Sequence, residues 1–294
     1  MAKLPPVDGL LVLDKPAGMT SRDAVNRCIA WFPRRTRVGH TGTLDPLATG
    51  VLVLCVGKAT RLAEFVQDMG KEYEAAITLG GRSTTDDADG TVTSLPCPEV
   101  DESKIRDVLT RFVGSIEQTP PAYSAVHVDG RRAHAIARQG DSPAIPSRMV
   151  NIERIDLLSY VWPILSLRVS CGKGTYIRSL ARDLGEVLGT GGYISALRRT
   201  RVGPFHADEG VPLDAERPEV MQSLRPTRDA IAQFPAVTLN DEQTSRVSHG
   251  QAVLIVGEAR GPVAMMTDSG ILIGIGNVSA EGMLQPGKIL NAMQ

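Results

Sequence analysis

The chain has little cysteine and no long apolar segment. Its longest apolar run is about the length of a strand, far short of the roughly 20 residues that a membrane span needs. Its first residues also lack the apolar core of a signal peptide. The four cysteines form no Cys-x-x-Cys pair, which favours reduced thiols and argues against a structural zinc site. We therefore expect a cytoplasmic protein without membrane or metal association. The cysteines are Cys28, Cys55, Cys97 and Cys171.

A surplus of positive charge is also absent, because the 294 residues have a formal net charge of −1. A nucleic-acid partner would therefore bind a local basic patch and not a globally basic protein. Single arginine clusters are more often solvated surface than binding sites, but three clusters flank the segments described below. They are Arg34, Arg35 and Arg37; Arg131 and Arg132; and Arg198, Arg199 and Arg201.

One polar loop lies directly before an apolar run. Residues 38–50, VGHTGTLDPLATG, contain a single carboxylate, Asp45, among residues that shape the backbone, namely three glycines and Pro46. The apolar residues 51–56 follow at once, so the pattern predicts a loop that packs against a buried strand. Such loops often contain functional residues. The alternative is a tight turn in which Asp45 is a cap.

Residues 38–50 closely resemble the catalytic motif of the pseudouridine synthases. The particular residues of this segment resemble those of the TruB family, the bacterial branch that modifies uridine in the T loop of tRNA. Four further segments resemble the other motifs of that family, in the same order, over nearly the whole first two thirds of the chain. They are LVLDKPAGMTS at residues 11–21, KEYEAAITLGGRSTTDDADG at 71–90, CGKGTYIRSLARDLGE at 171–186 and YISALRRTRVGPF at 193–205.

The resemblance implies an isomerase that converts uridine-55 of tRNA to pseudouridine. This reaction breaks the N1 glycosidic bond, turns the uracil and rejoins it through C5. No atom is gained or lost, so no cofactor and no metal are expected. By resemblance Asp45 is the nucleophile, and both C6 of the base and C1′ of the ribose remain open as its target. Arg178 is then the cation that compensates the charge of Asp45; the alternative is an ordinary surface arginine.

The resemblance also implies which residues surround the target base. Tyr73 is expected to lie against the base and is a candidate to remove the C5 proton, although a strand tyrosine is by default a packing residue. His40 is expected to stabilise the flipped-out nucleotide by stacking. The remaining positions are Tyr176 and Leu197, which match the base pocket, Arg61, which matches a basic contact, and Lys15, which either contacts the substrate or orients the end of its strand.

Local patterns predict an α+β fold, because strands and helices mix without a strict βαβ order. Apolar and polar residues alternate over residues 72–79, which places Tyr73 on the apolar face of a strand. Thr20 or Ser21 is expected to cap a helix over residues 22–31. Further strands are expected at residues 9–13 and 164–170, and further helices at 101–113 and 176–188.

The chain is expected to contain two domains. Residues 1–230 would form the catalytic domain, with a mixed, mainly antiparallel sheet. Residues 231–294 would form a small β domain, because short apolar runs alternate there with glycine-rich turns. By resemblance, residues 119–148 are an insertion that grips the RNA stem-loop, and the C-terminal domain also binds RNA.

Patterns typical of other sites are incomplete. Residues 171–175 do not complete a phosphate loop, residues 84–90 cannot close a calcium loop, and the signatures of Ser-x-x-Lys hydrolases and zinc deaminases are missing. Two alternatives to a stand-alone tRNA enzyme remain, a guide-RNA-dependent, dyskerin-like catalytic subunit and a noncatalytic tRNA-binding folding factor. The compact length and the lack of charged tails favour the stand-alone enzyme, which we expect to be a monomer without an obligate protein partner.

Overall fold

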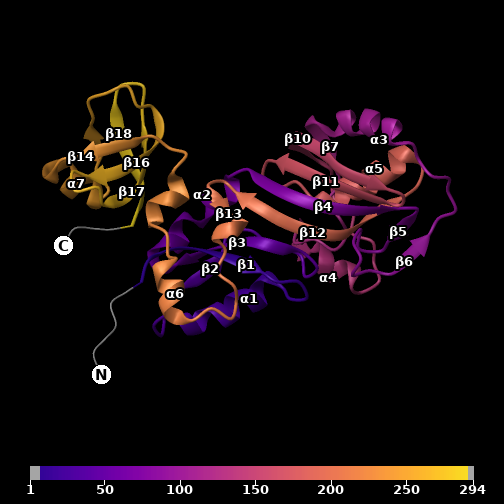
Figure 1. Cartoon of the computed structure of the whole chain (residues 1–294). Coiled ribbons are helices and arrows are strands. Elements are labelled where there is room, and N and C mark those ends of the chain that lie inside the picture. The colour runs from indigo at the N-terminus through magenta and orange to yellow at the C-terminus, as the bar shows by residue number, and fades with distance from the viewer. Residues whose placement is uncertain (1–6, 291–294) are drawn as a thin grey trace.

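The computed structural model describes residues 7–290 of the chain (Figure 1). The strands of its large sheet are β1 (Gly9–Lys15), β2 (Val38–His40), β3 (Thr49–Val56), β4 (Lys71–Leu79), β7 (Gly114–Gln118), β10 (Arg148–Val161), β11 (Ile164–Cys171), β12 (Gly192–Val202) and β13 (Phe205–His206). Seven of them follow the order β1-β3-β12-β4-β11-β10-β7, while β2 pairs with β3 and β13 with β12. Only the pairing of β12 with β3 is parallel. The expected α+β fold with a mixed, mainly antiparallel sheet is confirmed.

Helices cover both faces of this sheet. They are α1 (Ser21–Cys28), α2 (Ala63–Asp68), α3 (Glu102–Leu109), α5 (Ile177–Leu188) and α6 (Arg217–Gln222). Two further helices lie elsewhere: α4 (Ala133–Ala137) in the segment between β7 and β10, and α7 (Asp241–Ser248) on the C-terminal strands. One hydrophobic cluster lies between the sheet and α1, α3 and α5, and α2 contributes to a second cluster. A Cβ on Gly185 would lie 2.2 Å from the carbonyl carbon of Gly191, so glycine allows α5 to approach the start of β12 closely. In the described part of the chain, no helix is long and apolar enough to cross a membrane.

The elements expected from local patterns are present, with small changes at their ends. The burial of β4 alternates, and Tyr73 lies on its buried face. Helix α1 follows an N-cap at Thr20, whose hydroxyl accepts a hydrogen bond from the Asp23 amide. The last turn expected of this helix is a 3-10 turn, Ile29–Trp31, and α3 likewise continues into a 3-10 turn, Thr110–Phe112.

A second, five-stranded sheet lies in the C-terminal part of the chain. Its strands are β14 (Ala236–Leu239), β15 (Val253–Leu254), β16 (Gly261–Thr267), β17 (Leu272–Val278) and β18 (Met283–Ile289), in the order β14-β16-β17-β18-β15. Figure 1 shows this unit at one end of the molecule and α3 and α5 at the other. Leu272, Ile275 and Leu290 share the second hydrophobic cluster with Leu10 and Val12 of β1, so the two sheets are joined by an apolar interface.

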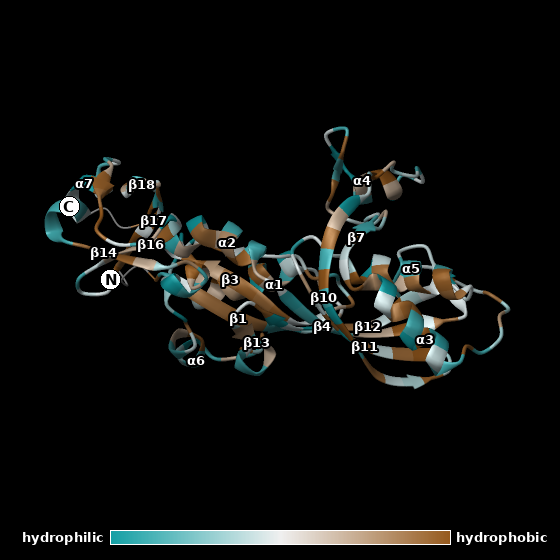
Figure 2. Cartoon of the chain, turned by 90° about the horizontal axis from the view of Figure 1, so that it is seen from above, coloured by the Kyte–Doolittle hydropathy of each residue, from teal (hydrophilic) through white to brown (hydrophobic). Residues whose placement is uncertain are grey.

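Residues 119–148 form an excursion between β7 and β10. They contain a short hairpin of β8 (His127–Val128) and β9 (Arg131–Arg132), which α4 follows. Figure 2 shows the segment around α4 standing away from the large sheet. Arg131 and Arg132 are exposed in this hairpin, so their charges face solvent.

Candidate active site

Asp45 lies in the loop between β2 and β3, and α1 fixes the residue before it. The Ser21 hydroxyl accepts a hydrogen bond from the Leu44 amide at 2.8 Å and donates one to the Leu44 carbonyl at 3.0 Å. The Ala48 amide donates to the Asp45 carbonyl at 3.1 Å and closes a turn. Ser21, one of two candidate caps in the sequence, therefore connects the first helix to the loop of the carboxylate, while Thr20 is the cap.

Lys15 lies at the end of β1 and is fully buried. Its Nζ donates to the carbonyls of Pro16 and Met19, each at 2.8 Å, and of Pro46 at 3.4 Å. Burial lowers the pKa of Lys15 to about 8, although the nearby Asp45 carboxylate counteracts this effect. Since all three partners are backbone carbonyls, the geometry favours the alternative in which Lys15 orients the backbone around Asp45.

Arg199 on β12 holds the other side of the loop. Its guanidinium is buried and donates to the carbonyls of Val51 at 2.7 Å, Gly42 at 3.1 Å and Thr43 at 3.5 Å. Arg199 also lies directly opposite Tyr73 in the pairing of β12 with β4. This arginine therefore connects the loop of Asp45 to the strand of Tyr73.

The cluster of Arg198, Arg199 and Arg201 is not a free basic patch. Arg198 forms a two-pronged ion pair with Asp14 at 3.0 Å, and Arg201 lies 4.0 Å from Glu72. Arg199 is buried. The expectation that this cluster is a basic patch for a nucleic-acid partner is wrong for Arg199. Its guanidinium is buried and donates its hydrogen bonds to backbone carbonyls inside the protein.

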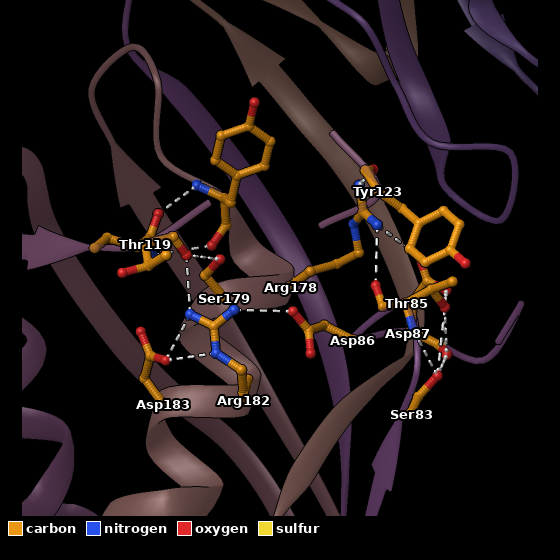
Figure 3. A network of polar contacts seen from close by, with 12 residues as sticks. Ser83, Thr85, Asp86, Asp87, Thr119, Tyr123, Arg178, Ser179, Arg182 and Asp183 are labelled. Carbon is orange, nitrogen blue, oxygen red and sulfur yellow. Dashed lines mark hydrogen bonds and ion pairs between the residues drawn. The ribbon is translucent and has the colours of Figure 1, made fainter. Parts of the chain in front are cut away.

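Arg178, in the first turn of α5, is the centre of the polar network (Figure 3). Its side chain is only 5% exposed, and Nη2 donates to Asp45 Oδ1 at 2.9 Å and to the Tyr123 carbonyl at 3.0 Å. Nη1 donates to the Thr85 carbonyl at 3.0 Å and lies 3.3 Å from Asp87 Oδ2. The surface-arginine alternative is therefore wrong, and the structure brings Arg178 and Asp45 together.

Asp87 is a member of this network that sequence analysis did not identify. It lies between β5 (Gly81–Ser83) and β6 (Val92–Ser94), and its side chain is 4% exposed. The Thr85 hydroxyl donates to Asp87 Oδ1 at 2.5 Å, and the Asp89 amide donates to the same oxygen at 3.1 Å. The sequence TTDDADG signalled an acidic loop, but nothing in that pattern indicated which aspartate meets Arg178.

The surroundings of Asp45 have opposite effects on its charge. Burial raises the pKa of Asp45, Arg178 lowers it, and the carboxylates of Asp87 and Asp89 raise it further; the net shift is upward. About a third of the side chain, 30%, still faces solvent. The site can therefore present one carboxylate to an incoming group, and its protonation depends on burial, on Arg178 and on two neighbouring carboxylates.

Comparison with known proteins supports a relationship over nearly the whole chain. The models described as "TruB family pseudouridylate synthase (N terminal domain)", "tRNA pseudouridylate synthase B C-terminal domain" and "Pseudouridine synthase II TruB, C-terminal" match residues 31–177, 178–215 and 235–290. The chain is 41% identical over 295 residues to tRNA pseudouridine synthase B of Xanthomonas campestris pv. campestris strain B100, an alignment that covers 98% of this chain and 96% of that protein. The chain belongs to the TruB family of pseudouridylate synthases. It is thus an enzyme that isomerises uridine.

Other relatives extend this comparison. The protein of the same name from Pseudomonas aeruginosa strain UCBPP-PA14 is 39% identical, over 97% of each chain. Among solved structures, a chain of a Cbf5-Nop10-Gar1 complex has a TM-score of 0.74 at 29% identity and covers 96% of this chain and 85% of its own. A chain of an archaeal box H/ACA Nop10-Cbf5 complex has a TM-score of 0.71 at 25% identity, with coverages of 96% and 86%.

In this TruB family enzyme, Tyr73 and His40 are both largely enclosed. Tyr73 is 8% exposed, and burial raises the pKa of its hydroxyl, an effect that Arg199 counteracts. Burial, together with the charges of Arg22 and Arg199, lowers the pKa of His40. The buried Nδ1 of His40 has no hydrogen-bond partner among the described residues. At neutral pH the site therefore presents a protonated phenol and an uncharged imidazole.

Tyr176 and Leu197 approach the site from different elements. Tyr176 immediately precedes α5, its amide donates to Gln118 Oε1 at 2.8 Å, and the Arg148 guanidinium lies 5.1 Å from its ring centre. Leu197 on β12 is buried and lies opposite Ala75 of β4, two residues from Arg199. Both residues are thus near neighbours in sequence of the two arginines that hold Asp45 and its loop.

Arg61 is not brought to Asp45. It lies in the 3-10 helix Gly57–Leu62, after the eight-residue strand β3, which is about 26 Å long. Its guanidinium donates to the Ile289 carbonyl of the C-terminal unit. Arg61 therefore lies at the junction of the two sheets and not beside Asp45.

Acidic, cysteine and histidine side chains do not gather into a metal site. Within residues 7–290, no group of three or more such residues is placed to hold a metal ion. The cysteines Cys28, Cys55 and Cys171 are buried, and burial raises the pKa of each thiol. These thiols are therefore neutral packing groups and not metal ligands.

Proposed function

We propose that this enzyme converts uridine-55 in the T loop of tRNA to pseudouridine, with Asp45 as the nucleophile. The relatives at 39% and 41% identity are named tRNA pseudouridine synthase B, which supports tRNA as the substrate. The observation that supports the chemistry most directly is the 2.9 Å pair of Arg178 Nη2 with Asp45 Oδ1. A permanent positive charge beside the carboxylate favours its ionised, nucleophilic form in a site that otherwise disfavours charge.

The proposed reaction begins with attack of ionised Asp45 on C6 of the uracil or on C1′ of the ribose. The N1–C1′ bond breaks, the uracil turns, and a bond forms between C5 and C1′. The proton at C5 leaves and N1 gains a proton. If the carboxylate of Asp45 is bonded to C1′, formation of the C5–C1′ bond displaces it; if it is bonded to C6, its bond to C6 breaks after the C5–C1′ bond has formed. In both cases the carboxylate is regenerated and the product is an isomer of the substrate. Tyr73 or water is the candidate acceptor of the C5 proton.

We propose that the target nucleotide swings out of its stack to reach Asp45. The Asp45 side chain is about two thirds covered, at 30% exposure, so a base stacked within a folded loop cannot place its ring against the carboxylate. Enzymes that modify a base commonly extrude it into a pocket lined by aromatic and apolar groups. His40, Tyr176 and Leu197 are proposed to receive the base, and Tyr73 to lie against it.

RNA binding outside the pocket is proposed for two regions. The first is the insertion of residues 119–148, whose exposed arginines can contact phosphates. The second is the C-terminal unit, with Arg61 and Lys288 at its junction with the large sheet. We place the boundary of the C-terminal domain after residue 230, near the end of the 3-10 helix Thr227–Ile231 and before β14.

The guide-dependent alternative is favoured by similarity to chains of solved H/ACA complexes. A chain from an H/ACA RNP bound to a substrate RNA containing 2′-deoxyuridine has a TM-score of 0.74 at 26% identity. A guide-dependent subunit requires added RNA and protein for activity, whereas the proposed enzyme acts alone as a monomer. A noncatalytic folding factor would bind tRNA without forming product.

The full chain and a synthetic T-arm hairpin with uridine at position 55 test the proposal. We expect pseudouridine at that position, without added guide RNA, protein or nucleotide and in excess EDTA. A hairpin with cytidine at position 55 should yield none there. Asp45→Asn should abolish product and leave RNA affinity nearly unchanged. The matched control is Asp68→Asn, which changes an exposed aspartate paired with Lys173 and should retain activity.

Turnover by a clean Asp45→Asn protein would exclude Asp45 as the nucleophile. Activity that requires a guide RNA would favour the particle, and binding without product would favour the folding factor. If EDTA abolishes activity while the hairpin remains folded, the cofactor-free mechanism is wrong.

A further inference from the structure

A second arginine on α5 binds the same two segments as Arg178. Arg182 follows Arg178 by four residues, so the two side chains lie on the same side of the helix. Nη1 of Arg182 donates to Asp86 Oδ2 at 3.0 Å, and Nη2 donates to the Thr119 carbonyl at 2.9 Å. Nε donates to Asp183 Oδ1 at 2.8 Å. Figure 3 shows Arg182 among Asp86, Thr119 and Asp183, and Arg178 beside Thr85 and Tyr123.

Asp86 lies directly between the two partners of Arg178 in the acidic loop. Its φ is 59°, a left-handed conformation that few residues other than glycine adopt and that aspartate and asparagine tolerate best. Its backbone carbonyl accepts from the Ile194 amide of β12 at 3.1 Å, while its carboxylate pairs with Arg182. A change at Asp86 would therefore move the Thr85 carbonyl and the Asp87 carboxylate, both of which orient Nη1 of Arg178.

The second shared segment is the beginning of the insertion. The Thr119 carbonyl accepts hydrogen bonds from Arg182 and from the Ser179 hydroxyl, the latter at 2.8 Å. Four residues later, the Tyr123 carbonyl accepts a hydrogen bond from Arg178. Arg182 is therefore in contact with two of the three segments that touch Arg178, although none of its own hydrogen bonds reaches the third, the loop of Asp45.

Burial distinguishes this pair from an ordinary surface ion pair. The side chains of Arg182 and Asp86 are 24% and 17% exposed. For comparison, Arg106 and Glu102 on α3 form a 2.6 Å pair whose side chains are 59% and 47% exposed. Surface pairs of that kind contribute little to stability. The α3 pair therefore provides a control in which the same chemistry has no role in the site.

We propose that Arg182 is a positioning residue for the reaction: through Asp86 and the Thr119 carbonyl it fixes the acidic loop and the start of the insertion, and thereby keeps Arg178 directed at Asp45. The inference rests on the roles proposed above for Asp45 and Arg178. Loss of Arg182 leaves Asp45 and Arg178 chemically intact but displaced. A misplacement of about 1 Å in a catalytic constellation can lower a rate roughly a hundredfold.

The test compares Arg182→Gln and Asp86→Asn with the control Arg106→Gln. Asp86→Asn removes the charge and retains a residue that tolerates the left-handed conformation. For each full-length variant, the single-turnover rate at saturating hairpin, the hairpin affinity and the thermal unfolding midpoint are measured. We expect both site variants to lose about tenfold or more in rate, with affinity nearly unchanged, and the control to match the unmodified protein.

The pH dependence of the rate separates positioning from plain structural support. Arg178 lowers the pKa of Asp45, so its displacement should move the acidic limb of the rate profile to higher pH. A variant that is only less stable keeps that limb in place when it is assayed below its unfolding temperature. In addition, the double variant Arg182→Gln/Asp86→Asn should lose no more than Arg182→Gln alone, since that single change already breaks the pair with Asp86.

Two further results complete the test. Arg182→Lys retains the charge but not the forked geometry, and should have an intermediate rate; it also serves if the Gln variant does not fold. Normal rates and an unshifted acidic limb in Arg182→Gln and Asp86→Asn would overturn the inference, provided that Asp45→Asn is inactive. If Asp45→Asn is itself active, the proposed function fails instead.

Discussion

Asp45 and Arg178 lie 133 positions apart in the sequence, and yet Arg178 Nη2 donates a hydrogen bond to Asp45 Oδ1 at 2.9 Å. The same guanidinium lies 3.3 Å from Asp87 Oδ2. Two carboxylates therefore share one buried cation. Because the cation favours ionisation and the second carboxylate opposes it, the position of Arg178 controls how much nucleophilic Asp45 is present.

Asp87→Asn is expected to reduce the rate without changing RNA affinity. The amide retains the shape of the side chain but removes the charge that holds Nη1 of Arg178, and a buried arginine that loses one of two anionic partners can shift. We expect a fall of about tenfold or more in the single-turnover rate. The control is Asp68→Asn, which changes an exposed aspartate paired with Lys173. Equal rates for the two variants would show that Asp87 does not orient Arg178.

Tyr73→Phe separates proton transfer from packing. The substitution retains the ring and its buried area and deletes only the hydroxyl. If Tyr73 is the base that removes the C5 proton, the single-turnover rate should fall about a hundredfold or more, with RNA affinity unchanged. This role also predicts an RNA-protein adduct that can be trapped. A near-normal rate would instead make Tyr73 a wall of the pocket and leave water or Asp45 as the base.

The rate should decline on the acidic side through a pKa above the ordinary aspartate value of about 3.9. Burial raises the pKa of Asp45 more than Arg178 lowers it, and only the carboxylate is nucleophilic. Single-turnover rates over an acidic pH series, with the protein shown to be folded throughout, measure this pKa. A rate that stays constant down to the ordinary aspartate range would contradict the upward shift.

The same shift predicts the effect of Asp45→Asn on stability. The pKa of Asp45 is higher in the folded protein than in the unfolded chain. The protonated carboxyl therefore stabilises the folded state at a pH below the unfolded pKa, and this stabilisation is lost as the pH rises through the folded pKa. At neutral pH the ionised Asp45 is therefore unfavourable, and Asp45→Asn should unfold at a higher temperature than the unmodified protein. Asp68→Asn should leave the midpoint nearly unchanged. A lower midpoint for Asp45→Asn would mean that Arg178 outweighs burial.

Removal of residues 237–294 should weaken RNA binding far more than chemistry, because all proposed catalytic residues precede residue 230 and lie outside the C-terminal unit. The truncation also exposes Leu10 and Val12 by deleting Ile275 and Leu290, so a lower unfolding midpoint is expected. Affinity should fall, and the slope of log affinity against log salt should become shallower by about one for each phosphate that the protein no longer neutralises. At saturating hairpin and below the unfolding temperature, the single-turnover rate of the truncated protein should match that of the full chain. A much lower rate at normal affinity would show that the C-terminal unit is part of the catalytic architecture.

Elements defined by neighbouring residues could be predicted from the sequence. The alternation in β4 places Tyr73 on the buried face, and a Thr-x-x-Asp box begins α1. The polar loop with Asp45 is followed by a buried strand, as expected. These features depend on the period of a strand or on hydrogen bonds within one helical turn. Ordered segments over two thirds of the chain also indicated the enzyme family.

Residue type and local spacing did not show which charged side chains meet. The family resemblance implied the pair of Arg178 with Asp45, but only the tertiary structure shows that strand order places Arg199 under the Asp45 loop and that α5 places Arg178 against the carboxylate itself. Asp87 was selected from three nearby acids in the same way, and Arg61 was separated from the site by the length of β3. Ionic contacts between distant segments depend on the order of strands in the sheet and on how closely α5 packs against it. Neither of these can be predicted from residue type or from the spacing of neighbouring residues.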